Sequence, residues 1–446
     1  MTCDHVSRFA LGPVEPPEDV LQFAAILFLD TLAVAAGAAA LDAGRIARDH
    51  AVRFLAAPDP RDRATLLFDG RWASIPGAAF ATATQIDNLD AHDGLNPTKG
   101  HIGCALVPAL CAFAETRPDL SARDAMIALV AGYEVAARAA IALHATVKDY
   151  HTSGAWNGLG VAVLGCRLRG LGPDVLRHAF GMSEYHGPRS QMMREIANPT
   201  MLHDGSGMGA LVGAMSVLQA EDGFTGAPAI TVEEAAAYWA DLGRVWTVPQ
   251  NYVKPYPICR WAHAALDALA ALMNAHRFTA KDVTRIEVRT FKEAAALFPD
   301  MPDTTSQAQY SLSFALATLL VRGRIGPSDI VGPALCDPQT AQSLTLIHIE
   351  ESDRHSRRFP QGRWSDVTVT LTDGRVLCSG DVHARGGPEA PMALSEIAEK
   401  FDAFAMSLAP ERRAAIWSWR DTLLRPDRRF ADLLKLLHPA PEVGHG

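Results

Sequence analysis

Four segments of this sequence, each broken by glycine or proline, carry side chains that could move protons. The first, DNLDAHDGLNPTKGHIG at residues 87–103, lies in a chain otherwise rich in alanine and leucine. Its titratable side chains include Asp90, His92, Asp93, Lys99 and His101. Such a set suits general acid–base catalysis, because imidazole and carboxylate groups can accept and return protons. The alternative is a solvated loop, since Asp-x-x-Asp-Gly also favours turns.

The other three segments offer fewer groups each. KDYHTSGAWNG contributes His151 just before a predicted helix, and NPTMLHDGSGMG contributes His203. VKPYPICRWAH contributes Lys254, Arg260 and His263 near a predicted domain boundary. Taken singly, a histidine at a helix start is more often a cap or a satisfied polar group. Together, several imidazoles, a carboxylate and a lysine on loops of one scaffold indicate an acid–base site.

Motifs for other kinds of catalysis are missing from the sequence. It contains no H-E-x-x-H zinc motif, no P-loop and no G-x-S-x-G nucleophile elbow. The seven cysteines are scattered without a C-x-x-C pair, which predicts reduced thiols and no disulfide framework, zinc site or iron–sulfur cluster. We therefore expect catalysis by ordinary side chains, with no metal and no cofactor.

Composition and charge exclude several classes of partner. The 446 residues carry a net charge of -9 and a pI near 6.0, which argues against nucleic acid but leaves room for a small anionic substrate. The first ten residues lack the pattern of a signal peptide. Residues 21–41 are apolar enough to span a bilayer, but Asp30 near their centre favours a core helix. We expect a cytoplasmic protein that does not bind membranes.

Hydrophobic periodicity divides the chain into two kinds of structure. From about residue 20 to residue 241, apolar residues recur at helical spacing, which predicts a bundle of Ala-rich helices. After the proline-rich stretch VPQNYVKPYPICRW, runs such as VTRIEVRTF predict strands among helices, and Asp373-Gly374 predicts a hairpin turn. We therefore predict a mainly α protein. A large all-helical domain comprises residues 1–255 and 390–446, and a smaller α+β lid domain comprises residues 256–389.

The chain resembles the MmgE/PrpD family along nearly its whole length. This family includes 2-methylcitrate dehydratase, cis-aconitate decarboxylase and iminodisuccinate epimerase. The resemblance rests on stretches in the family's order, among them FLDTLAVAAGA, NLDAHDGLNPTKGHIGCALVPALCAFAE, YHTSGAWNGLGVAVLGCRLRGLG, MLHDGSGMGALVGAMSVLQAEDGFTGAP and KPYPICRWAHAALDAL. It implies a helical domain with an α+β lid, a homodimer, and a metal-free site between the domains for small di- or tricarboxylates. The family's site residues match Asp90, His101, His151 and Lys254.

Three positions depart from the family's pattern. Gly94 stands where a threonine is common, and one extra residue follows before His101. Thr200 replaces a lysine, which leaves His203 as the nearby candidate, and Phe314 replaces a tyrosine of the lid. These changes remove a hydroxyl, a cation and a phenol. They count against cis-aconitate decarboxylation and weaken the case for the methylcitrate reaction.

We hypothesise proton abstraction α to a carboxylate. His101 and His151 are the candidates for base and acid, Asp90 orients one of them or is itself the base, and Lys254 neutralises the enolate-like intermediate. The expected substrate-binding residues are Lys99, His203, Arg260 and His263. Loss of a β-hydroxyl would make the enzyme a dehydratase, which we favour, and reprotonation on the opposite face would make it an epimerase. A catalytically inactive, carboxylate-binding homologue is the alternative from another functional class.

Overall fold

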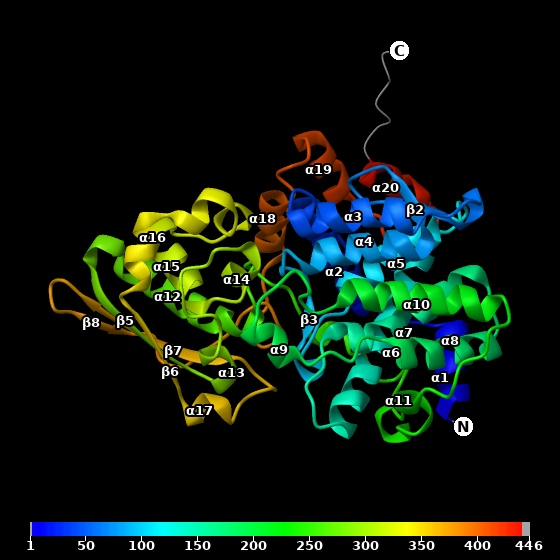
Figure 1. The fold of residues 1–446 in the computed structure, drawn as a ribbon, viewed down its shortest axis with the longest axis horizontal. Helices are drawn as coiled ribbons and strands as arrows, with labels where there is room; N and C mark the ends of the chain where they lie inside the picture. Colours follow the sequence, from blue (N-terminus) through cyan, green and yellow to red (C-terminus); the bar gives the residue numbers. More distant parts are fainter. Residues whose placement is uncertain (1, 439–446) are drawn as a thin grey trace, which may run out of the picture.

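A computed structural model of the chain describes residues 2–438. Its helical body and its sheet-containing body lie side by side, with β3 and α9 between them (Figure 1). The protein is therefore mainly α with an α+β part, as the sequence predicts.

The helical body is built from long, tightly packed helices. Its main helices are α2 (Glu18–Ala38), α3 (Asp42–Phe54), α4 (Ile75–Asp87), α5 (Gly103–Ala114), α6 (Ala122–Thr146), α7 (Asn157–Arg169), α8 (Pro173–His186) and α10 (Ser206–Glu221). Shorter elements are α1 (Thr2–Leu11), α9 (Met192–Ala197), α11 (Ile230–Glu233), β1 (Arg63–Thr65) and β2 (Trp72–Ser74). Glycines allow close helix contact: a Cβ on Gly160 would lie 2.7 Å from the carbonyl oxygen of Gly132.

Two helices are long and apolar enough to cross a membrane, but both lie largely inside the fold. They are α2 and α6, whose most apolar windows are 78% and 89% buried. In α2, the Asp30 carboxylate forms an ion pair with Lys400 at 2.7 Å. Such burial is typical of core helices in a soluble protein, as we expected for residues 21–41.

The second body contains a mixed sheet covered by helices. Its strands are β5 (Val283–Thr290), β6 (Ile347–Glu351), β7 (Trp364–Leu371), β8 (Val376–Cys378) and β9 (Val382–His383), in the order β6-β5-β7-β8 with β9 also paired to β7. β5 is parallel to β6 and antiparallel to β7. The predicted strand VTRIEVRTF is β5, and the predicted turn at Asp373-Gly374 joins β7 to β8, with Gly374 at φ 86°.

Helices complete this body and return the chain to the first one. They are α12 (His263–His276), α13 (Lys292–Ala295), α14 (Thr305–Gln309), α15 (Leu312–Arg322), α16 (Pro338–Leu344) and α17 (Asp353–Ser356). The tail helices α18 (Leu394–Phe404), α19 (Pro410–Trp417) and α20 (Phe430–Leu437) follow. The ring of Phe430 packs 5.7 Å from that of Phe28 in α2, so the tail rejoins the helical body. Our boundaries at residues 255 and 389 stay a prediction.

A two-residue ladder joins the segments that carry the candidate site. β3 (Gly94–Leu95) pairs antiparallel with β4 (Asn251–Tyr252). Gly94 has no side chain because none would fit: a Cβ there would lie 2.3 Å from the hydroxyl of Tyr252 and 2.9 Å from His101 Nδ1. A larger side chain has no space at this position, and the ladder brings the loop of Asp90 close to the segment of Lys254.

Candidate active site

Backbone conformation singles out the loops of the candidate site. Within residues 2–438, five non-glycine residues have positive φ, and three of them are predicted site residues: Asp90 at 51°, Lys99 at 53° and His203 at 46°. L-residues rarely adopt this region, and such strained positions concentrate at functional sites. The intrinsic backbone preferences of these residues therefore do not account for the conformation of the loops.

Asp90 and Lys254 form a buried ion pair. The ammonium of Lys254 donates to Asp90 Oδ1 at 2.5 Å, and the two side chains are 0% and 5% exposed. The other oxygen of Asp90, Oδ2, has no hydrogen-bond partner within the described part of the chain. The pair thus holds a carboxylate in place and leaves one of its oxygens free for another group.

His101 is held in one orientation just before α5 begins. Its Nδ1 lies 2.7 Å from the carbonyl oxygen of Asp93, and its backbone N–H donates to Ser153 Oγ at 2.9 Å. Because a carbonyl only accepts hydrogen bonds, the proton sits on Nδ1 and Nε2 keeps its lone pair. Asp204 Oδ2 lies 3.7 Å from Nε2. His101 is therefore oriented to act as a base through Nε2.

A small cavity lies between the two bodies. The helical body contributes Asp90, Lys99 and His101 to its wall, and the residues after β4 contribute Arg260, Tyr310 and Arg363. Its volume is about 20 Å³, which suffices for about one water molecule. The two bodies are therefore closed over this cavity, which is too small for a ligand larger than about one water molecule.

Two buried arginines give this cavity a positive wall. The guanidinium of Arg260 donates to the carbonyl oxygens of Arg385 and Ala384 at 2.6 and 2.9 Å and lies 4.2 Å from the ring centre of Tyr252. Arg363 donates to the carbonyl oxygen of Pro360. Neither forms an ion pair with a carboxylate within residues 2–438. Burial lowers the pKa of Arg260 to about 10, which leaves this side chain a cation at neutral pH, and burial also lowers the pKa of Arg363.

Four predicted residues lie outside the cavity wall: His151, His203, Lys254 and His263. His151 follows Tyr150, which does line the cavity, and its backbone N–H donates to His144 Nε2 at 3.3 Å. His263 Nε2 lies 2.9 Å from the carbonyl oxygen of Ile258, and its Nδ1 faces Arg260 at 3.4 Å. In this closed state, His263 contacts the guanidinium of Arg260 and does not itself line the cavity.

His203 lies between the small cavity and a larger one. Its Nδ1 is 3.5 Å from the hydroxyl of Tyr310, which lines the small cavity, whereas His203 itself lines the neighbouring cavity of about 640 Å³. Burial lowers the pKa of His203 to about 4, so this imidazole is neutral at pH 7. Thr200 lines the same larger cavity, where its hydroxyl donates to Glu195 at 3.0 Å.

Sequence reasoning missed several residues of the wall. Tyr252 and Tyr310 supply phenol hydroxyls, and burial raises the pKa of both, so they stay protonated. Tyr310 lies between α14 and α15, and Phe314 is buried in the first turn of α15. Tyr252 lies two residues before Lys254 in the stretch VPQNYVKPYPICRW, so the sequence offered it as a candidate beside Lys254. Arg363, from a turn before β7, had no sequence signal.

One group of donors in this site could bind a metal ion. A donor atom from each of Asp90, His92 and His101 lies within 4.8 Å of the other two. Lys254 already supplies a positive charge to Asp90, which favours an acid–base interpretation of the same residues. That the site works without metal or cofactor stays a prediction.

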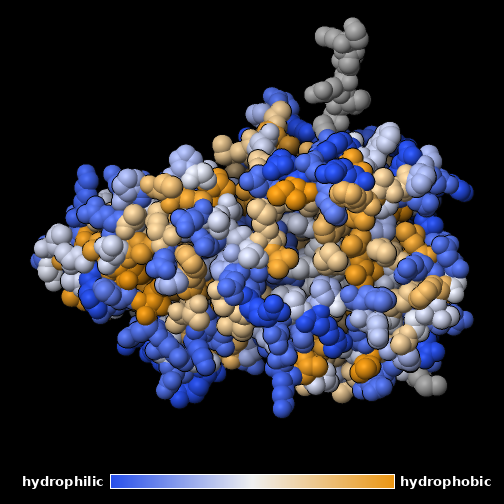
Figure 2. Space-filling view, viewed as in Figure 1, coloured by the Kyte–Doolittle hydropathy of each residue, from blue (hydrophilic) through white to orange (hydrophobic). Residues whose placement is uncertain are grey.

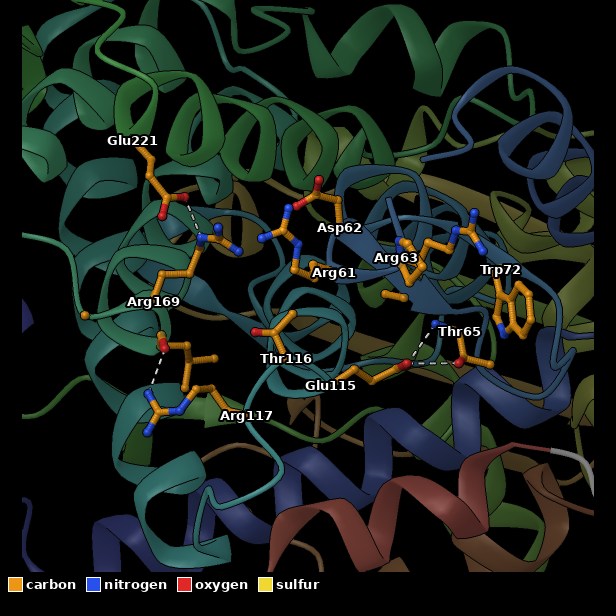
Figure 3. Close-up of a pocket in the computed structure, with 14 residues that line it drawn as sticks. Arg61, Asp62, Arg63, Thr65, Trp72, Glu115, Thr116, Arg117, Arg169 and Glu221 are labelled. Carbon is orange, nitrogen blue, oxygen red and sulfur yellow. Dashed lines mark hydrogen bonds and ion pairs between the residues drawn. The ribbon is translucent and has the colours of Figure 1, made fainter. Parts of the chain in front are cut away.

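A larger surface cavity lies elsewhere on the helical body (Figure 3). Its volume is about 810 Å³, and two of its acidic side chains are already bonded: Glu221 pairs with Arg169 at 2.5 Å, and Glu115 accepts from Thr65 at 2.8 and 2.9 Å. It contains none of the predicted site residues. The size of a cavity therefore does not by itself select the candidate site, which we place at the cavity between the two bodies because that cavity contains predicted site residues.

Comparison with known proteins agrees with this architecture. The model of the MmgE/PrpD N-terminal domain matches residues 5–243, and that of the MmgE/PrpD C-terminal domain matches residues 256–421. Among curated proteins, none matches the chain.

Proposed function

Because this chain belongs to the MmgE/PrpD family, whose members are generally lyases, we propose that it is a hydro-lyase similar to 2-methylcitrate dehydratase. The base removes a proton α to a carboxylate of a small di- or tricarboxylate, and the protonated base then gives a proton to the departing β-hydroxyl, which leaves as water. The observation that carries the proposal is the small cavity whose wall contains both His101 and two buried arginines that form no ion pair with a carboxylate within residues 2–438. Such a cavity suits an anion that is attacked by a base.

The reaction needs a base, a cationic wall and the exclusion of water. His101 is the base, since its Nδ1–H is held by the carbonyl oxygen of Asp93 and its Nε2, 3.7 Å from Asp204 Oδ2, makes no hydrogen bond within the described residues. Arg260 and Arg363 bind the substrate carboxylates and the negative charge that develops on them. Tyr252, which keeps its proton, donates a hydrogen bond to the enolate-like oxygen. Closure removes water, and so each of these interactions is stronger than in solution.

An epimerase is the second candidate, because it shares the first step. Lys99 lines the same cavity, and burial lowers its pKa, so a further group is available to return a proton to the substrate. Decarboxylation is less well supported, since Gly94, Thr200 and Phe314 replace a hydroxyl, a cation and a phenol. An inactive homologue that only binds carboxylates would need the arginines, but it would not need His101 to be held in one tautomer.

Solvent-hydrogen exchange distinguishes these functions. The protein is incubated in heavy water with citrate, 2-methylcitrate, malate, cis-aconitate or iminodisuccinate, and deuterium uptake and products are followed by NMR. We expect loss of water, with deuterium at the α carbon of the remaining substrate wherever proton removal is reversed before water leaves. Exchange with inversion and no elimination would favour the epimerase. A ligand that binds without any exchange would contradict proton abstraction altogether.

Substitution of the base tests the assignment of the site. His101→Gln should reduce kcat/KM at least about a hundredfold, the usual contribution of a general base. His144→Gln is the matched control, because His144 contacts the backbone of His151 and does not line the cavity. Its rate should remain within about threefold of wild type. Equal losses in the two variants would mean that His101 is not the base.

We also propose that the protein is a cytoplasmic homodimer. Exposed apolar side chains gather on the face formed by α3, α4 and α10 (Figure 2), including Phe54, Met208 and Met215. Apolar surface of this kind commonly marks a protein interface. Sedimentation equilibrium should give twice the chain mass for wild type and a monomer for Met208→Glu/Met215→Glu. A wild-type monomer at micromolar concentration would refute the dimer.

A further inference from the structure

Residues 90–93 form a buried segment that positions two groups of the candidate site. Asp90 carries the carboxylate that is bonded to Lys254, and the carbonyl oxygen of Asp93 fixes the tautomer of His101. All four residues of the segment are buried, and none belongs to a helix or strand. Buried backbone groups need hydrogen-bond partners, and a segment without regular structure does not obtain them from a helix or a sheet. The conformation of residues 90–93 therefore depends on groups from elsewhere in the chain.

Lys400 supplies one of these groups from the tail of the chain. It lies on α18, which packs against the helical body where the two bodies meet (Figure 1). Its ammonium donates to the carbonyl oxygen of Ala91 at 2.8 Å and to Asp30 of α2 at 2.7 Å. Lys400 thus reaches across 309 positions of sequence to the middle of the buried segment.

The backbone of this segment needs such external support. Asp90 has a φ of 51°, a conformation that persists in a non-glycine residue only where its surroundings fix it. Lys254 binds the side chain of Asp90, and Lys400 binds the carbonyl oxygen of the next residue. The two lysines therefore hold the segment by a side chain and by the backbone, respectively.

The pairing with Asp30 allows a buried ammonium at this position. The side chains of Lys400 and Asp30 are 3% and 0% exposed. Burial lowers the pKa of Lys400 and raises that of Asp30, and the charge of each residue opposes the effect of burial on the other. Lys400 does not line the small cavity, so any influence on the chemistry passes through the residues that it holds.

We propose that Lys400 is a positioning residue for the candidate base: by holding the carbonyl oxygen of Ala91, it keeps the carbonyl oxygen of Asp93 on Nδ1 of His101. The proposal rests on the proposed function in that it takes His101 as the base. Without Lys400, the carbonyl of Ala91 is buried without a donor, and the segment shifts to find one. The proton of His101 is then no longer confined to Nδ1, and a fraction of the molecules carries it on Nε2, where the base needs its lone pair.

The tautomer of His101 in the free protein tests this proposal without any substrate. In protein labelled with ¹⁵N in histidine, the resonances of His101 are those missing from His101→Gln. The protonated and the bare nitrogen of a neutral imidazole have well-separated resonances, which move towards each other when the two tautomers mix. Lys400→Met should bring them together. Asp30→Asn is the matched control, because it removes the ion pair but keeps the amine that donates to Ala91, and it should retain the wild-type resonances.

A paired variant separates positioning from stability. Lys400→Met leaves the Asp30 carboxylate buried and uncompensated and should lower the urea midpoint, whereas Asp30→Asn/Lys400→Met leaves no such charge and should recover much of it. The resonances of His101 should stay displaced in the paired variant, because Ala91 still lacks its donor. Wild-type resonances in the paired variant would overturn the proposal in favour of a purely structural role. An equal displacement in Asp30→Asn and Lys400→Met would overturn it too.

Turnover gives a second measurement, which depends on the proposed function. In the paired variant, kcat should fall at least about tenfold, since a misplaced base acts poorly in the transition state. KM should stay within about threefold of wild type, because Lys400 does not line the cavity. Unchanged kcat would overturn the positioning role. If wild type acts on no substrate of the panel, the proposed function fails, and the resonances of His101 still decide whether Lys400 sets its tautomer.

Discussion

The ion pair between Lys254 and Asp90 allows a quantitative test of how the site is held together. Both side chains are almost completely buried, and Nζ and Oδ1 are 2.5 Å apart. At that distance and an effective dielectric constant of about 20, their attraction is roughly 7 kcal/mol, which offsets the cost of removing both charges from water. Removal of one partner leaves the other charge buried and uncompensated.

The perturbation is a double-mutant cycle of Lys254→Met and Asp90→Asn. Each single variant should lose about 3–5 kcal/mol of unfolding free energy, as for other broken buried pairs. Asparagine tolerates the left-handed backbone of position 90, where φ is 51°, so this substitution changes charge and little else. The double variant leaves no uncompensated charge, and its loss should be at least about 2 kcal/mol smaller than the sum of the single losses.

The assay is urea unfolding followed by circular dichroism, with turnover measured on the same samples. The double variant should recover stability but not activity, because the site then lacks both charged groups. Additive losses, or a Lys254→Met variant that loses less than about 1 kcal/mol, would refute the reasoning that an isolated buried charge dominates. Recovered activity in the double variant would show that neither group takes part in the reaction.

Three further substitutions test other parts of the site. Arg363→Met should weaken the binding of citrate about thirtyfold, as measured by calorimetry. It should not lower the free energy of unfolding, because it removes a buried cation that has no ion-pair partner within the described residues. Unchanged affinity would exclude Arg363 from the binding wall. Gly94→Ala should reduce the free energy of unfolding in urea by about 1–3 kcal/mol, because the added Cβ would lie 2.3 Å from the hydroxyl of Tyr252. Gly172→Ala, where open space surrounds the added Cβ, should reduce it much less. Equal reductions would argue against the tight pairing of β3 with β4. Burial raises the pKa of Asp93 from 3.8 to about 7, so the folded state binds this proton more tightly than the unfolded state does. The free energy of unfolding of the wild type should therefore fall by up to about 4 kcal/mol as pH rises from about 4 to 7. Asp93→Asn should show a smaller loss between pH 5 and pH 8 by urea midpoint, and an identical pH profile would contradict the shift.

The sequence by itself determined the features that depend on short-range pattern. Helical spacing predicted the Ala-rich body, alternation predicted β5, and Asp373-Gly374 predicted the hairpin between β7 and β8. These succeed because a helix or a hairpin is specified by residues a few positions apart. The gathering of titratable groups in residues 87–103 was visible for the same reason, since Asp90, Lys99 and His101 lie on one loop and line one cavity.

Only the tertiary structure decided which distant residues meet. Lys254 reaches Asp90 across 164 positions of sequence, and Arg363 joins the same cavity from a turn before β7 without any local motif. It also placed His151 outside the cavity wall in this closed state, although its loop carries the expected residues. Contacts of this kind depend on how the two bodies pack, and the pairing of β3 with β4 that aligns them is too short to leave a recognisable pattern in the sequence.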